Sequence, residues 1–373
     1  MSMISEVQIS PKSAESFTSI LGRETVEGVR GLAADLQQKL NGRVIWNVNS
    51  TAAGGGVAEM LHTLLAYAKG MDVSTRWLVV SGNPDYFRIT KRIHNALHGE
   101  LGDGSPLDAN AAAIYDKVIE ENAKELLNYV RPDDVVILHD PQTAGLIPYL
   151  VDKGVGVFWR CHIGNDNQGE QDAIAWKFLQ PYLKAATGFI YSRFSYLPEF
   201  IYHGRCLIVP PSIDPFSPKN QHMTASSIRA IMVHLGLVSG DAGSGSRTFT
   251  LADGSRSRVE RRAEIVREGE APSWKTPLVV QVSRWDRLKD PIGVLHGFIK
   301  SIESSSNTSE LLLVGPSVAA VADDPEGAEV CEEVKAEWHK LPVATRSRVQ
   351  LVNLPMDDLQ NGCRSISNCS VWR

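Results

Sequence analysis

The segment RVIWNVNSTAAGGGVAEMLHTLLAYAKGMDVSTRWLVVSG, residues 43–82, decides the fold. It begins with an apolar run, Arg43–Asn49, which predicts a buried strand, and it ends with a similar run over residues 75–82. Between them a glycine-rich turn leads into an apolar segment, residues 57–69, that predicts a helix. A strand, a helix and a second strand in this order favour a parallel sheet in the α/β class.

The same alternation continues to residue 215. Apolar strands are expected at residues 133–140, 155–163 and 188–192, with a helix over residues 175–188 and further helices within residues 86–130. We therefore expect one complete doubly wound, Rossmann-like domain over residues 43–215. Residues 1–42 precede it as a helical arm, because apolar residues recur at three- and four-residue steps from Ser16 to Leu40.

The alternation of strands and helices stops over residues 216–276, which we expect to be a linker. Its insertion, Asp241–Ala271, alternates around Asp253-Gly254 and predicts an exposed β-hairpin. The hairpin carries several arginines, and a solvated face is favoured over a binding patch because acidic residues are interspersed.

A second β/α alternation occupies residues 277–360. It predicts three parallel strands with their helices, which is about half of a doubly wound domain with one sheet edge open. A further helix is expected to begin at Met356. The tail, residues 361–373, fits neither pattern, and a frame shift and a short disordered terminus are both open.

Composition excludes several classes of protein. The net charge of -5 argues against nucleic-acid binding. No apolar run reaches the roughly 18–20 residues needed to span a bilayer, so we expect no membrane association. The first twenty residues lack a secretory signal, and the five cysteines show no C-x-x-C spacing, so a cytoplasmic protein is expected.

The glycine-rich turn, Gly54-Gly55-Gly56, is the first candidate site. Glycines allow a ligand to approach the backbone, and the following helix start favours an anion. A dinucleotide site would need a carboxylate about twenty residues on, which this chain lacks, and the turn is not an ATPase P-loop. The turn predicts a phosphate or sugar near a helix start, with a tight turn that binds nothing as the alternative.

Two histidines follow expected strand ends. His139 is followed by Asp140, and His162 follows Trp159-Arg160-Cys161. Ligands of open α/β sheets gather at the carboxyl ends of strands, so these side chains are candidates to orient a sugar hydroxyl. A structural histidine is the alternative for each, and no partner at metal-site spacing accompanies them, so no metal is expected.

A basic loop follows the first strand of the second alternation. Arg284 and Lys289 bracket the segment Trp285–Leu288 before an expected helix. A planar guanidinium and a compact ammonium suit a diphosphate. A charged surface loop with ion pairs is the alternative interpretation.

These segments together carry a resemblance. The pattern S-R-x-D-x-x-K-D at residues 283–290 resembles the phosphate-binding loop of GT-B glycosyltransferases, which pair two Rossmann-like domains. The stretches NSTAAGGGVAEML, KRIHNALHG, LHDPQTAGLI, WRCHIG and VPPSIDPFSPKN resemble the trehalose synthase (trehalose glycosyltransferring) and trehalose phosphorylase branch. The fold expected from this resemblance is a GT-B-like α/β fold with one complete domain and an incomplete second one.

The resemblance implies a retaining glycosyltransferase that moves glucose from a nucleoside-diphosphate-glucose donor to a sugar acceptor. It also implies that the partners are sugar substrates and that the reaction needs neither a cofactor nor a metal. The residues it implicates are His162, Arg284 and Lys289 in catalysis, Gly55 and Gly56 with the same two cations at the donor phosphates, and His94, Asp140 and His139 at the acceptor.

Two departures from the family pattern bear on activity. The family continues with an E-G-F-G-L-x-x-x-E segment that this chain does not contain, so we expect its own activity to be impaired. His162-Ile163 is followed by Gly164-Asn165-Asp166, which leaves the acceptor open. A trehalose phosphorylase and a non-catalytic, truncated fragment remain alternatives, and a homodimer is one option for the assembly.

Overall fold

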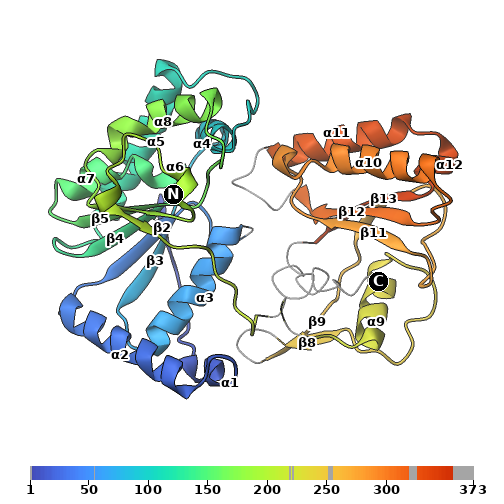
Figure 1. Cartoon of the computed structure of the whole chain (residues 1–373), viewed down its shortest axis with the longest axis horizontal. Helices are drawn as coiled ribbons and strands as arrows, with labels where there is room; N and C mark the ends of the chain where they lie inside the picture. The colour runs from blue at the N-terminus through green and yellow to red at the C-terminus, as the bar shows by residue number, and fades with distance from the viewer. Residues whose placement is uncertain are drawn as a thin grey trace. The chain divides into compact units, whose positions relative to one another are not determined.

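The computed structural model describes residues 2–53, 55–217, 220, 222–250, 255–318 and 326–355. Gly54, the helix expected from Met356 and the tail over residues 361–373 lie outside them. The chain divides into two compact units, Met1–Ile213 and Asp214–Arg373. Each unit is an α/β structure around its own sheet (Figure 1).

Unit 1 contains a seven-stranded sheet in the order β1-β3-β2-β4-β5-β6-β7. All neighbours pair in parallel except β1, which is antiparallel to β3. The strands are β1 (Ile4–Val7), β2 (Ile45–Asn49), β3 (Thr75–Val80), β4 (Val135–His139), β5 (Gly156–Cys161), β6 (Gly188–Tyr191) and β7 (Cys206–Ile208).

Helices cover both faces of this sheet (Figure 1). One face, with Trp77 and Val79, packs against α3, and the opposite face, with Leu78, belongs to the large core that includes α4, α5 and α8. Alternate residues of β3 thus point into different cores, as a strand requires. The helices of at least five residues are α2 (Arg23–Leu40), α3 (Gly56–Gly70), α4 (Pro84–Leu97), α5 (Ala109–Leu126), α7 (Ile147–Val151) and α8 (Glu170–Leu183), and the four-residue helices are α1 (Thr18–Leu21) and α6 (Pro141–Ala144).

The N-terminal region differs from the expected helical arm. Residues 4–7 form the edge strand β1, so this region belongs to the sheet of unit 1. The expected single helix from Ser16 is interrupted at Gly22, which has a φ of 82° and separates α1 from α2. A positive φ cannot continue a right-handed helix, so the apolar spacing alone gave the wrong start.

Unit 2 contains a four-stranded sheet in the order β10-β13-β12-β11. Its strands are β10 (Glu264–Val266), β11 (Leu278–Val282), β12 (Glu310–Pro316) and β13 (Val349–Leu354), with α9 (Ala225–Leu235), α10 (Pro291–Ser304), α11 (Glu326–Lys340) and α12 (Val343–Arg346). The three expected parallel strands are confirmed, but β10 adds an antiparallel strand at β13. The edge of the sheet at β13 is therefore paired with β10.

Cores lie on both faces of this second sheet as well. Leu311 and Leu313 pack with residues of α10 and α11, whereas Leu312 and Val314 pack with residues of α9. The expected hairpin is confirmed, because β8 (Thr248–Thr250) pairs antiparallel with β9 (Arg256–Arg258). No helix in the described part of the chain has the length and apolar character needed to cross a membrane.

Candidate active site

His139 and His162 meet at the carboxyl edge of the sheet in unit 1. β4 ends at His139, β5 ends one residue before His162, and the two strands are adjacent and parallel. Nδ1 of His139 lies 2.9 Å from Nε2 of His162, within hydrogen-bonding distance. The two strand-end histidines therefore form one hydrogen-bonded pair, as the arrangement of parallel strand ends predicts.

Asp140 joins the pair through the backbone. Its Oδ1 accepts a hydrogen bond of 2.8 Å from the amide of His162, and its own amide donates to the carbonyl of Arg160 at 2.9 Å. Its φ of 61° and ψ of -179° lie in a region that is essentially restricted to glycine. Trp159 holds this conformation further, because its Nε1 donates to the Asp140 carbonyl at 3.0 Å.

Burial sets the protonation of this cluster. It lowers the pKa of His139 well below 6.5 and lowers the pKa of His162 to about 3, with the nearby Arg160 acting in the same direction. Burial also raises the pKa of Asp140 to about 7. Both imidazoles are thus neutral at physiological pH, and the carboxyl group is poised between its two forms. Neutral imidazoles and a carboxyl group are suited to hydrogen bonding with hydroxyl groups.

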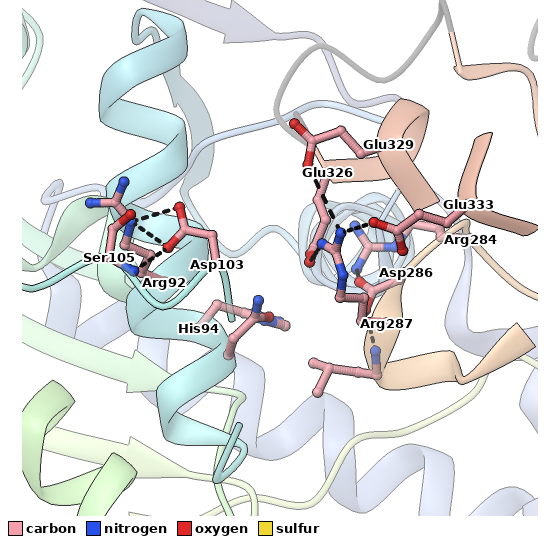
Figure 2. Close-up of polar contacts among 12 residues, drawn as sticks. Arg92, His94, Asp103, Ser105, Arg284, Asp286, Arg287, Glu326, Glu329 and Glu333 are labelled. Atoms are coloured by element: carbon pink, nitrogen blue, oxygen red, sulfur yellow. Dashed lines mark hydrogen bonds and ion pairs between the residues drawn. The ribbon is translucent and has the colours of Figure 1, made fainter. Parts of the chain in front are cut away.

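His94 comes from a neighbouring element. It lies in the last turn of α4, with its ring 4.8 Å from that of His98. Gly99, just after α4, adjoins the loop after His162, since a Cβ at Gly99 would lie 2.4 Å from the side-chain nitrogen of Asn165. On the same helix Arg92 pairs with Asp103 at 2.9 Å (Figure 2).

Gly55 and Gly56 begin α3 with unoccupied space around them. Gly55 is the N-cap residue and provides no side-chain cap, and Gly56 is the first helical residue. A Cβ added at either position would meet no atom within 4 Å, and neither residue has a positive φ. Neither packing nor backbone conformation in the described structure requires glycine at these two positions.

In unit 2 the basic loop has the predicted place between β11 and α10. Asp286 is buried and accepts hydrogen bonds from the amide of Leu288 at 2.8 Å and from Arg284 at 3.4 Å (Figure 2). Lys289 is exposed in the short 3-10 turn that follows. Arg284 is therefore oriented by a buried carboxylate, while Lys289 extends from a backbone fixed by Asp286 and Gln281.

Arg287 has a different role from its two basic neighbours. Its guanidinium pairs with Glu326 and Glu333 of α11 (Figure 2). This ion-pair network fastens the loop to a helix and takes up the donors of Arg287. The sequence did not reveal these partners of Arg287, which was not among the phosphate-binding candidates.

Sequence reasoning missed three buried polar residues. Asn47 accepts from His139 Nε2 at 3.1 Å, Arg160 lies beside the histidines and Asp140, and Asp286 supports Arg284. Asn47 lies between the apolar residues Trp46 and Val48 of a strand, which was a usable signal because a buried amide needs partners. Among the described residues, no group of three or more His, Cys, Asp or Glu is arranged to hold a metal ion.

Comparison with known proteins identifies relatives of this chain. Residues 47–198, which include the histidine pair, match the family described as trehalose synthase, N-terminal domain. The chain is 30% identical over 326 residues to the trehalose synthase of Pyrococcus horikoshii, covering 87% of this chain and 66% of that protein. It is 29% identical over 327 residues to the trehalose synthase of Rubrobacter xylanophilus, covering 87% of this chain and 67% of that one.

Trehalose phosphorylases are also related. That of Pleurotus sajor-caju is 33% identical over 190 residues, covering 47% of this chain and 25% of the relative. Among solved structures, the α,α-trehalose-phosphate synthase (UDP-forming) of Burkholderia vietnamiensis matches with a TM-score of 0.56 at 13% identity, covering 84% of this chain and 73% of that one. That likeness confirms the expected GT-B fold class. The chain spans only about two thirds of the length of the trehalose synthases it matches.

Proposed function

We propose that this chain, a GT-B-fold homologue of the trehalose synthases and trehalose phosphorylases, is a retaining glycosyltransferase that moves glucose from a nucleoside-diphosphate-glucose donor to a sugar acceptor. The observation that carries the proposal is the cluster of His139, Asp140 and His162 at the carboxyl edge of the sheet, inside the matched N-terminal domain. Neutral imidazoles beside the carboxyl group of a residue with a strained backbone form a preorganised set of partners for sugar hydroxyls.

Unit 1 would bind the sugars. Asp140 and His139 are proposed at the acceptor with His94, and His162 is proposed beside the transferred glucose. The pKa of Asp140, raised to about 7 by burial, lets its carboxyl group donate or accept a hydrogen bond near neutral pH. The open start of α3 at Gly55 and Gly56 would leave room for the donor phosphates beside free amides.

Unit 2 would supply positive charge to the donor diphosphate. Arg284 would bind it through guanidinium donors oriented by Asp286, and Lys289 would add a point charge. In the proposed step the bond between glucose C1 and the donor phosphate oxygen breaks, and a bond from C1 to the acceptor oxygen forms on the same face. The acceptor proton passes to the leaving phosphate, so no carboxylate nucleophile, metal or cofactor is required.

The kinetic test compares two arginines. Full chain is incubated with UDP-glucose or ADP-glucose and glucose, and release of the nucleoside diphosphate is followed. We expect Arg284→Gln to lower kcat/KM by roughly 100-fold, the order of effect seen when a transition-state charge partner is removed. Arg256→Gln, on the exposed hairpin, is the matched control and should leave the rate unchanged. Equal rates for both variants would exclude Arg284 from the donor site.

A trehalose phosphorylase is the second candidate, favoured by the 31–33% identity to proteins of that name. It would convert trehalose and inorganic phosphate to glucose and glucose 1-phosphate. Phosphate-dependent consumption of trehalose, with no dependence on a nucleotide, would select this function. Glucose binding in calorimetry without turnover of either donor would instead indicate a non-catalytic, sugar-binding chain.

A further inference from the structure

We infer that Thr75 and Asn47 are positioning residues that set the tautomer of His162 through His139, so that His162 presents an unprotonated Nδ1 to a ligand hydroxyl. The four side chains form a continuous hydrogen-bonded series across β3, β2, β4 and the end of β5. The assignment of tautomers depends on this series alone, whereas the role toward a sugar rests on the proposed function.

The series begins at a backbone carbonyl, which can only accept. Thr75 Oγ1 lies 3.0 Å from the carbonyl oxygen of Ile45, so the Thr75 hydroxyl donates its single proton there. The same hydroxyl must then accept from Asn47, whose side-chain nitrogen lies 3.3 Å away. The NH₂ group of the Asn47 amide therefore faces Thr75. Its carbonyl oxygen consequently faces His139.

The orientation of Asn47 determines both histidines. His139 Nε2 lies 3.1 Å from the Asn47 oxygen and must carry a proton in order to donate. A neutral imidazole has one N–H, so His139 Nδ1 is an acceptor. His162 Nε2, at 2.9 Å from that nitrogen, must therefore carry the proton of His162. The remaining nitrogen, His162 Nδ1, is left without a proton.

Ring geometry supports the histidine–histidine bond. The two planes differ by only 10°, and the ring centroids lie 5.3 Å apart, well beyond the 2.9 Å between the bonded nitrogens. The rings thus meet edge to edge, so that the N–H of one points at the in-plane lone pair of the other. Face-to-face stacking would not align these groups.

Burial prevents protonation of the histidines from changing the donors and acceptors of this series. Thr75, Asn47 and His139 are between 1% and 5% exposed. The same burial keeps the pKa of both imidazoles below physiological pH, so neither gains a second N–H. His162 is the partly exposed end of the series and the member that can meet a ligand.

This arrangement restricts what His162 can bind. An unprotonated nitrogen accepts a hydrogen bond, so its partner must be a donor such as a sugar hydroxyl. An ionised phosphate oxygen offers no proton and is repelled by the lone pair. His162 is therefore assigned to a hydroxyl of the sugar and excluded from the diphosphate.

The direct test is long-range ¹H–¹⁵N NMR of the histidine rings in the full chain, which reports the protonated nitrogen. We expect the Nε2-protonated tautomer for both His139 and His162 in the wild type. We expect Thr75→Val, which retains the β-branched shape but lacks the hydroxyl, to release Asn47 and produce Nδ1-protonated His162. Thr75→Ser keeps the hydroxyl and should preserve the wild-type signature. Nδ1-protonated His162 in the wild type, or an unchanged signature in Thr75→Val, would overturn the inference.

The same variants test the ligand role by calorimetric titration with glucose. Thr75→Val should bind glucose about tenfold more weakly, the loss expected for one hydrogen bond, while Thr75→Ser stays within about twofold. If the tautomer changes but the glucose affinity does not, the assignment of His162 to a sugar hydroxyl is wrong. If the wild type shows the expected tautomers but binds no glucose, the positioning role stands and the proposed function is contradicted.

Discussion

Asp140 combines a strained backbone with a buried carboxyl group. Its backbone occupies a region that costs of order 1–3 kcal/mol for a residue with a Cβ, and its carboxyl group is buried enough to raise its pKa to about 7. The bonds to Arg160, His162 and Trp159 hold it in place. Such strain clusters at functional sites, which agrees with the place of Asp140 in the proposed acceptor site.

The pKa of Asp140 gives a signed prediction. A carboxyl group whose pKa is raised from 3.8 to about 7 on folding contributes stability below pH 3.8 and loses it as the pH rises toward 7. Asp140→Asn, which keeps the oxygen that accepts from His162, removes this loss. Its free energy of unfolding relative to wild type should therefore rise between pH 4 and pH 8, by at most about 4 kcal/mol. Urea unfolding of both proteins at several pH values measures it, and a pH-independent difference would refute the assignment.

His162 titrates with the opposite sign. Because burial lowers its pKa from 6.5 to about 3, it contributes stability above pH 6.5 that is lost as the pH falls toward 3. We expect His162→Gln to be less sensitive to acid than wild type between pH 6.5 and pH 4 in the same unfolding experiment. His203→Gln, at an exposed histidine, is the control and should follow the wild-type curve.

At the scale of elements, a substitution at the start of α3 tests whether glycine is needed there for ligand binding or for packing. Gly56→Ala should leave the stability unchanged or slightly higher, because a Cβ there meets no atom within 4 Å. It should raise the KM for the nucleotide-sugar donor several-fold, since the methyl group would occupy the proposed phosphate space. Gly28→Ala, inside α2 with equally open surroundings, should raise stability by up to about 1 kcal/mol without changing the KM. An unchanged KM in both variants would remove α3 from the donor site.

The elements also show what the sequence can predict. Strands β2 to β6 and β11 to β13 followed from their apolar runs, because parallel strands buried on both faces are apolar throughout. The edge strands β1 and β10 were missed, since they contain only four and three residues and are defined by their partners β3 and β13. Short antiparallel edges have no distinctive local pattern, so tertiary pairing decides them.

The candidate site was predictable to a similar extent. His139 and His162 could be assigned to one sheet edge because both follow strands of a parallel sheet. Their hydrogen bond, and the support from Asn47 and Thr75, depend on the strand order, which places β2 between β3 and β4. Spacing along the chain does not contain that information. Asp286 was likewise visible only as one acidic residue in a basic loop.

At the scale of the whole molecule, each unit carries part of the proposed chemistry on a sheet with two cores. Unit 1 presents hydrogen-bonding groups at strand ends, and unit 2 presents cations before a helix. Neither set is sufficient for glycosyl transfer alone, because the reaction needs both sugar positioning and neutralisation of the leaving phosphate. The proposed transfer therefore requires residues of both units.

The most direct test of this account is the product formed by the full chain from a nucleoside-diphosphate-α-glucose and glucose, identified by the anomeric signals in ¹H NMR. The account predicts trehalose with both glucose units in the α configuration, formed in equal amounts with the nucleoside diphosphate and without added phosphate. An inverted, β-linked product, or turnover of trehalose that depends on phosphate and not on nucleotide, would contradict it.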